Sequence, residues 1–100
     1  MYYLPAVTQI EAEKVAAFLE ENWGLDQSEA TMQLRKESGA YELAILLKEG
    51  IDVDSITGDM SRMACGLESE IFDGAYVNVL AFDSDATSFR DEILRREFCR

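Results

Sequence analysis

Two pairs of aspartates have the side chains and the spacing that could hold a metal ion. Asp52 and Asp54 follow one predicted strand, and Asp83 and Asp85 follow another. Carboxylate oxygens are the preferred ligands of Mg²⁺ and Ca²⁺, so a site shared by both pairs is one hypothesis. The alternative is helix capping, because aspartates before a helix bind its free amides and favour its dipole. This spacing favours capping, and we expect no cofactor other than Mg²⁺ or Ca²⁺.

A second candidate is a partner surface on the helix predicted between Ile56 and Ile71. The side chains opposite its apolar stripe are mostly small: Gly58, Ser61, Arg62, Cys65 and Ser69. Since the distance between packed elements depends on the side chains at the contact, this face could receive a partner, the terminal helix or a second copy of the chain in a homodimer. The alternative is a small polar surface exposed to water, where serine and glycine are common.

Nucleophilic catalysis has little support in the residue types. The chain contains no histidine, which removes Ser-His and Cys-His pairs, histidine bases and most transition-metal sites. Cys65 falls in mid-helix beside Arg62, without a base to activate it, and we expect Cys99 to be exposed and inert except to oxidation. Two cysteines without a CxxC spacing predict neither a disulfide framework nor a zinc site. These observations favour a binding protein over an enzyme.

The charge balance narrows the class of partner. Twenty acidic and nine basic residues give a formal net charge of −11. The chain has no cluster of lysine and arginine, so we expect no direct binding to nucleic acid or to an anionic membrane. The acidity favours a basic protein partner, including one whose nucleic-acid site the domain occupies by mimicking nucleic-acid charge. The alternative is that the charge only keeps the protein soluble.

Length and hydropathy indicate one domain over residues 1–100, with 48% hydrophobic residues to form its core. No stretch approaches the roughly 18 apolar residues of a membrane helix. The N-terminus lacks a basic region followed by an apolar run, which argues against a secretory signal. We therefore expect a cytoplasmic protein.

The clearest structural pattern is a β-hairpin over residues 30–48 with a two-residue turn at Ser38 and Gly39. Glycine supplies the positive φ angle that such a turn needs. The turn fixes the facing residues, and a slip of one position would reverse the buried and exposed faces. The predicted pairs are Arg35 with Glu42, Leu34 with Leu43, Met32 with Ile45 and Ala30 with Leu47.

Helices and strands alternate along the rest of the chain. A capping box at Thr8 and Glu11 predicts a helix that ends near Trp23. Apolar residues at helical spacing predict the helix near 56–71, alternation predicts a strand over 75–82, and a final helix is expected over 86–98.

The order β-α-β-β-α-β-α predicts an α+β domain whose four-stranded antiparallel sheet has helices on one face. We favour a ferredoxin-like (split β-α-β) order with an added C-terminal helix. There a short first strand, expected over residues 1–4, separates the third strand from the fourth, and the two aspartate pairs lie about 10 Å apart on one edge of the sheet. The resulting functional hypothesis is a small acidic, non-catalytic protein-binding or regulatory module. The alternative is a ligand- or metal-binding domain or enzyme that uses the aspartate edge.

Overall fold

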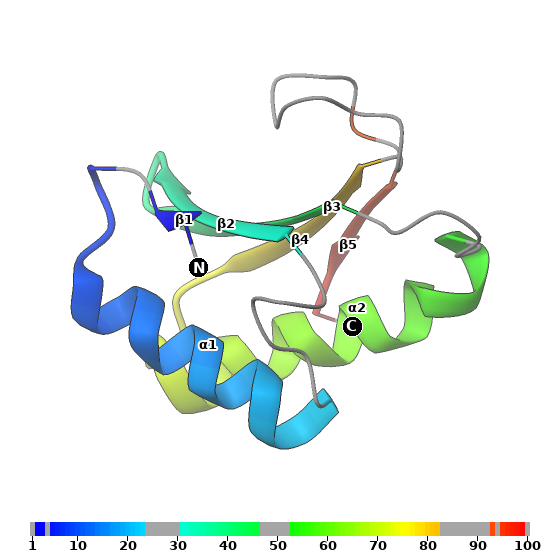
Figure 1. Ribbon diagram of the computed structural model, residues 1–100, viewed down its shortest axis with the longest axis horizontal. Coiled ribbons are helices and arrows are strands. Elements are labelled where there is room, and N and C mark those ends of the chain that lie inside the picture. Colours follow the sequence, from blue (N-terminus) through cyan, green and yellow to red (C-terminus); the bar gives the residue numbers. More distant parts are fainter. Residues whose placement is uncertain are drawn as a thin grey trace.

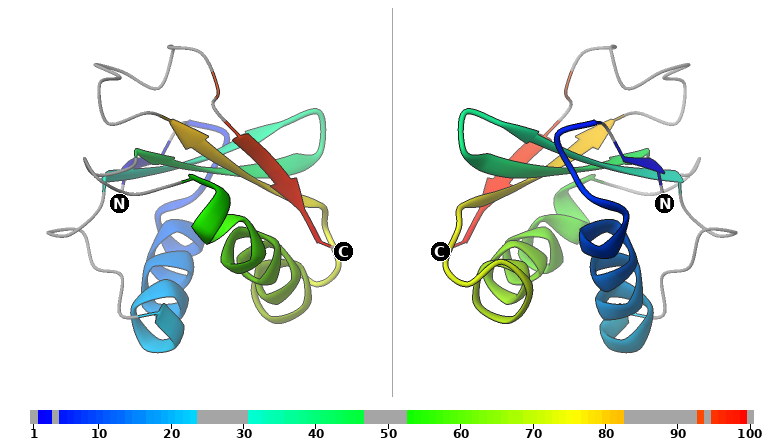
Figure 2. Two further views of the ribbon diagram at one scale, coloured as in Figure 1. Left: turned by 90° about the vertical axis from the view of Figure 1, so that its right-hand side faces the viewer. Right: turned by 90° about the vertical axis from the view of Figure 1, so that its left-hand side faces the viewer.

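The computed structural model describes residues 2–3, 5–23, 31–46, 53–82, 93 and 95–99. Its strands are β1 (Tyr2–Tyr3), β2 (Thr31–Glu37), β3 (Ala40–Leu46), β4 (Val77–Phe82) and β5 (Arg95–Phe98). Its helices are α1 (Gln9–Trp23), α2 (Val53–Gly66) and the π-helical turn η1 (Leu67–Ile71), which continues α2. The helices lie on one face of the sheet (Figures 1 and 2), so the molecule has an α+β architecture.

The sheet is mixed, and its strands follow the chain in the order β1-β2-β3-β4-β5. Strands β1 and β2 are parallel, as are β3 and β4, whereas β2–β3 and β4–β5 are antiparallel. The predicted antiparallel sheet is therefore wrong, and the ferredoxin-like order is not observed, because β1 lies at the edge beside β2. Each helix connects neighbouring strands. Strands β3 and β4 are apolar on both faces, and such strands are favoured at the centre of a sheet. Strand β1, which has only two residues, lies at the edge.

The hairpin has the predicted register. Its turn residues have positive φ angles, 52° at Ser38 and 82° at Gly39. The observed pairs include Met32 with Ile45, Leu34 with Leu43 and Arg35 with Glu42. The predicted pair of Ala30 and Leu47 lies outside the described residues. Strand β2 is not an edge strand, although its alternating pattern would suit one, since β1 pairs with it at Gln33 and Leu34.

The predicted C-terminal helix is wrong at residues 95–98, which form strand β5. This strand pairs antiparallel with β4 from Ala81 opposite Arg95 to Asn78 opposite Phe98. Residues 86–92 and 94 of that prediction lie outside the described part of the chain. The open edge of β4 offers backbone hydrogen bonds to a segment with little helical periodicity, and this tertiary pairing outweighs the helix propensity of arginine and glutamate.

The main core lies between the helices and one face of the sheet. The predicted stripe of α2 is buried there at Met60, Met63 and Leu67, and Ile56 and Ile71 pack at its margin. From α1, Val15 and Leu19 are fully buried. A smaller cluster on the opposite face of the sheet contains Ala44, Leu80 and Phe82, with Leu46 and Ile93 packed against it.

The two helices meet where α2 passes into η1. A Cβ atom built at Gly66 would lie 2.4 Å from Cζ of Phe18 in α1, which is closer than carbon atoms can approach. Glycine at this position therefore leaves room for the Phe18 ring. Among the described residues, no helix has both the length and the apolar composition that a membrane span requires.

Candidate functional site

Of the four aspartates predicted as a possible metal site, the structure describes only Asp54. Asp54 lies in the first turn of α2 and is exposed, whereas Asp52, Asp83 and Asp85 are outside the described residues. Because β3 and β4 are parallel neighbours, their ends are one strand spacing apart, about 4.8 Å, and not the predicted 10 Å. Within residues 2–3, 5–23, 31–46, 53–82, 93 and 95–99, no group of three or more acidic, cysteine or histidine side chains could hold a metal ion.

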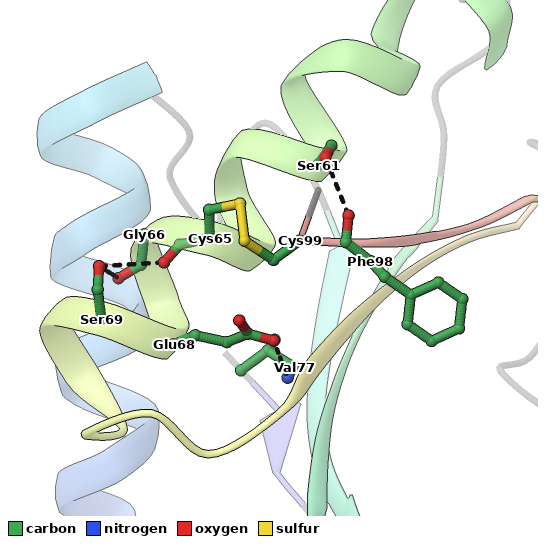
Figure 3. The surroundings of a disulfide bond; sticks show 8 residues. All are labelled: Ser61, Cys65, Gly66, Glu68, Ser69, Val77, Phe98 and Cys99. Carbon is green, nitrogen blue, oxygen red and sulfur yellow. Dashed lines mark hydrogen bonds between the residues drawn. A yellow bond between two sulfur atoms is a disulfide. The ribbon is translucent and has the colours of Figure 1, made fainter.

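The small face of α2 lies partly against the C-terminal strand. Figure 3 shows Ser61 and Cys65 directed toward the end of β5, and the Ser61 hydroxyl donates a 2.9 Å hydrogen bond to the Phe98 carbonyl. Ser69 donates to the Cys65 carbonyl of its own helix at 3.1 Å. Gly58 is exposed, and Arg62 is exposed and pairs with Asp59 at 2.7 Å. This face therefore receives a terminal segment, although that segment is a strand and not a helix.

Cys65 and Cys99 form a disulfide that links α2 to the residue following β5 (Figure 3). Their Cα atoms are 4.5 Å apart, and the bond joins positions separated by 34 residues. Cys99 is exposed, as predicted, but it is not a free thiol. Cys65 is half-buried. The sequence reasoning expected neither a disulfide framework nor a zinc site from the two cysteines, and it missed this bond.

A buried carboxylate lies on β5 beside this junction. Glu97 is 1% exposed and accepts a 2.9 Å charge-assisted hydrogen bond from Nε of Arg95, two residues earlier. Glu97 faces Val79 of β4, whose side chain belongs to the main core. Removing an ionised carboxylate from water costs free energy. The ion pair with Arg95 offsets part of this cost for Glu97.

The helices carry most of the described negative charge. Elements α1, α2 and η1 contain eight acidic and two basic residues, whereas β2 to β5 contain three acidic and four basic residues. The acidic residues of the helices are Glu11, Glu13, Glu20, Glu21, Asp54, Asp59, Glu68 and Glu70. The helix layer, defined as α1, α2 and η1, is thus an acidic surface on one side of a sheet with nearly balanced charge.

An open groove of about 390 Å³ runs between α1 and η1. Apolar side chains and exposed polar ones both contribute to its walls. It is lined by Lys14, Ala17, Phe18, Glu21, Asn22, Glu70 and Ile71. The lining thus combines apolar side chains with two exposed carboxylates and one exposed lysine, a mixture that suits a peptide segment with both basic and apolar side chains.

The N-terminus of α1 is attached to the hairpin through Tyr41. Thr8 and Glu11 form the predicted capping box, with the Thr8 amide donating to Glu11 Oε1 at 2.9 Å and the Glu11 amide donating to Thr8 Oγ1 at 3.2 Å. The other oxygen of Glu11 accepts a hydrogen bond from the Tyr41 hydroxyl. The Tyr41 ring stacks on Phe72 with their centroids 3.8 Å apart, and Lys36 Nζ lies 5.0 Å from the Tyr41 centroid.

This network holds Tyr41 in its protonated form. The hydrogen bond to Glu11, together with burial and the negative charge of Glu11, raises the pKa of Tyr41 to about 12. The same hydrogen bond, assisted by the Thr8 amide, lowers the pKa of Glu11. The contacts of Tyr41 with Glu11 and Phe72 therefore join the N-terminus of α1 to the hairpin.

The opposite face of the sheet carries an ion cluster. Glu42 lies 3.7 Å from Nε of Arg35 and 3.5 Å from a terminal nitrogen of Arg96. The Arg35 guanidinium also lies 6.0 Å from the centroid of Phe82. These contacts connect β2, β3, β4 and β5 across the sheet and compensate the buried charge of Glu42, which is consistent with a structural role.

The fold and its surface define an acidic α+β domain with a mixed sheet and a one-sided helix layer. A family profile described as AF_1994_N, family N-terminal domain, matches residues 1–91, and the chain belongs to this family. The matched region includes Cys65 but neither β5 nor Cys99. No curated protein and no solved structure matches the chain.

Proposed function

We propose that this protein is a cytoplasmic, non-catalytic binding module whose helix layer engages a basic segment of a partner protein. The observation that carries the proposal is the uneven charge, with eight acidic and two basic residues on the helices but three and four on strands β2 to β5. Charge complementarity of this kind speeds association and excludes like-charged partners. In a narrower form of the proposal, the partner is a nucleic-acid-binding protein whose site the acidic surface occupies.

The groove between α1 and η1 is the part of the helix layer best suited to bind such a segment. Glu21 and Glu70 are exposed carboxylates on opposite walls, while Phe18 and Ile71 contribute apolar surface between them. A partner segment with lysine or arginine beside a leucine-sized side chain would contact both the carboxylates and the apolar surface of the groove. Apolar contact would supply binding energy, and the carboxylates would supply orientation.

The test is the binding of a fluorescent amphipathic peptide with lysine and leucine at helical spacing, followed by anisotropy. The variant Glu21→Gln/Glu70→Gln should weaken binding about tenfold, because two charge-assisted contacts are lost. Glu37→Gln/Asp73→Asn makes the same change in net charge at two exposed residues that do not line the groove and should weaken binding less than about twofold. Equal losses in the two variants would indicate diffuse acidity and reject the groove. Absence of peptide binding at low salt would reject the proposal.

The metal-binding alternative predicts a different result. If Ca²⁺ binds at Asp52, Asp54, Asp83 and Asp85, the melting temperature should be higher in CaCl₂ than in NaCl at the same ionic strength. Asp54→Asn should then abolish the extra rise, whereas Glu20→Gln on α1 should not. Identical melting curves in the two salts would remove this alternative and leave the peptide-binding proposal as it stands.

A further inference from the structure

We propose that the Cys65–Cys99 disulfide is a reversible redox site, cleaved by a dithiol reductant, and that its cleavage releases β5 from α2. The site joins an exposed residue, Cys99, to a half-buried one on the helix. Figure 3 shows the bond between α2 and the end of β5, and neither cysteine belongs to the main core. This inference does not depend on the proposed binding of a basic partner, because its test measures reduction of the disulfide and opening of β5 directly.

The reaction is a thiol–disulfide exchange. A thiolate of the reductant attacks the sulfur of the more exposed Cys99, the S–S bond breaks, and Cys65 leaves as a thiolate that takes up a proton. The second thiol of the reductant then attacks the mixed disulfide and releases Cys99. Two electrons pass to the protein cysteines, and the dithiol becomes a disulfide.

The non-covalent attachment of β5 consists of its pairing with β4, its packing on α2 and the ion pair of Arg96 with Glu42 at 3.5 Å. The strand has four residues, against seven in each of β2 and β3, and its described neighbour in the sheet is β4. It brings the buried carboxylate of Glu97 into the interior, and desolvation of that charge opposes docking. The hydrogen bond from Ser61 to the Phe98 carbonyl favours docking but is exposed to water. The covalent link adds to these contacts, and we expect its loss to shift the balance toward the undocked strand.

Reduction should open β5 to solvent while the hairpin stays folded. Strand β5 contains two tryptic sites, Arg95 and Arg96, and the hairpin contains a matched internal control at Arg35 and Lys36. Proteolysis reports local opening, so cleavage in β5 should accelerate about tenfold or more after reduction, with the hairpin sites unchanged.

The experiment treats the oxidised native protein with dithiothreitol, blocks free thiols by alkylation, and follows tryptic cleavage by mass spectrometry. We expect two alkylated cysteines without denaturant, accelerated cleavage after Arg95 and Arg96, and unchanged cleavage after Arg35 and Lys36. Cys99→Ser should show this cleavage with or without reductant, and if that variant fails to fold, the reduced native sequence still gives the result. Resistance to reduction until denaturant is added, unchanged cleavage in β5, or equal acceleration at the hairpin sites would each overturn the proposal.

Discussion

The two helices are attached to the sheet by different chemistry. Helix α1 is held at its N-terminus by the hydrogen bond from Tyr41 to Glu11 and by the capping box with Thr8. Helix α2 is joined to β5 by a covalent bond between Cys65 and Cys99. The first attachment depends on pH, and the second depends on the thiol–disulfide balance. The sheet contains two β-α-β units, β1-α1-β2 and β3-α2-β4, and the attachments of their helices respond to different conditions.

Both units share a core, and its disruption should outweigh loss of either attachment. Leu67 is fully buried at the junction of α2 and η1. We expect Leu67→Ala to lower the free energy of unfolding by about 2–5 kcal/mol through lost burial and a residual cavity. Urea denaturation measures this change. Ile10→Ala, at a side chain that is 65% exposed on α1, is the control and should change stability by less than about 0.5 kcal/mol.

Removal of the disulfide should have the next largest effect. Cys65→Ser/Cys99→Ser opens a link between residues 34 positions apart, and loss of that constraint on the unfolded chain corresponds to about 2–4 kcal/mol. Chemical denaturation of the oxidised protein and of the variant gives the difference. A difference near zero would show that the link does not stabilise the fold and would weaken the contrast between the two attachments.

The hairpin joins the two units, and its turn can be broken locally. Gly39 has a φ angle of 82°, so a β-branched residue there adopts a strained backbone even though space is free around its Cβ position. Gly39→Val should cost about 1 kcal/mol or more in unfolding free energy. Gly58→Ala in α2 is a useful comparison, since its Cβ position is also open but no positive φ is involved, and it should be neutral or stabilising.

The smallest change in stability is expected for loss of the Tyr41–Glu11 hydrogen bond, and its dependence on pH distinguishes the attachment of α1 from that of α2. Tyr41→Phe removes one hydrogen bond and should cost about 1 kcal/mol at neutral pH. Because folding raises the pKa of Tyr41 from 10.0 to about 12, the stabilisation is complete below pH 10 and is lost as the pH rises toward 12. Melting curves between pH 8 and pH 12 should show this loss in the native sequence and not in Tyr41→Phe. Parallel curves for the two proteins would contradict the role assigned to this hydrogen bond.

The sequence predicted what depends on neighbouring residues. The register of the hairpin followed from the turn at Ser38 and Gly39 and from alternation in both strands, and the capping box at Thr8 and Glu11 has the expected hydrogen bonds. These features could be predicted because each is determined within a few residues.

Sheet order and the disulfide depend on contacts between distant segments. The sequence pattern of a β-α-β unit is the same whether its two strands are neighbours in the sheet or have another strand between them. The pattern therefore could not predict that β1 lies beside β2. The disulfide had one available signal. Cys65 lies on the small face of α2 that was predicted as a possible contact for the terminal segment, and Cys99 belongs to that segment.

The most direct test of the contrast between the two units is amide hydrogen exchange by NMR in the oxidised and the reduced protein. Arg35 of β2 reports on the hairpin and Glu97 reports on β5, because the amide of each is directed at the strand with which it pairs. We predict that reduction lowers protection at Glu97 by about tenfold or more and leaves Arg35 unchanged, because the disulfide joins β5 to α2 and does not involve β2. Equal loss of protection at both amides, or no loss at Glu97, would contradict the account.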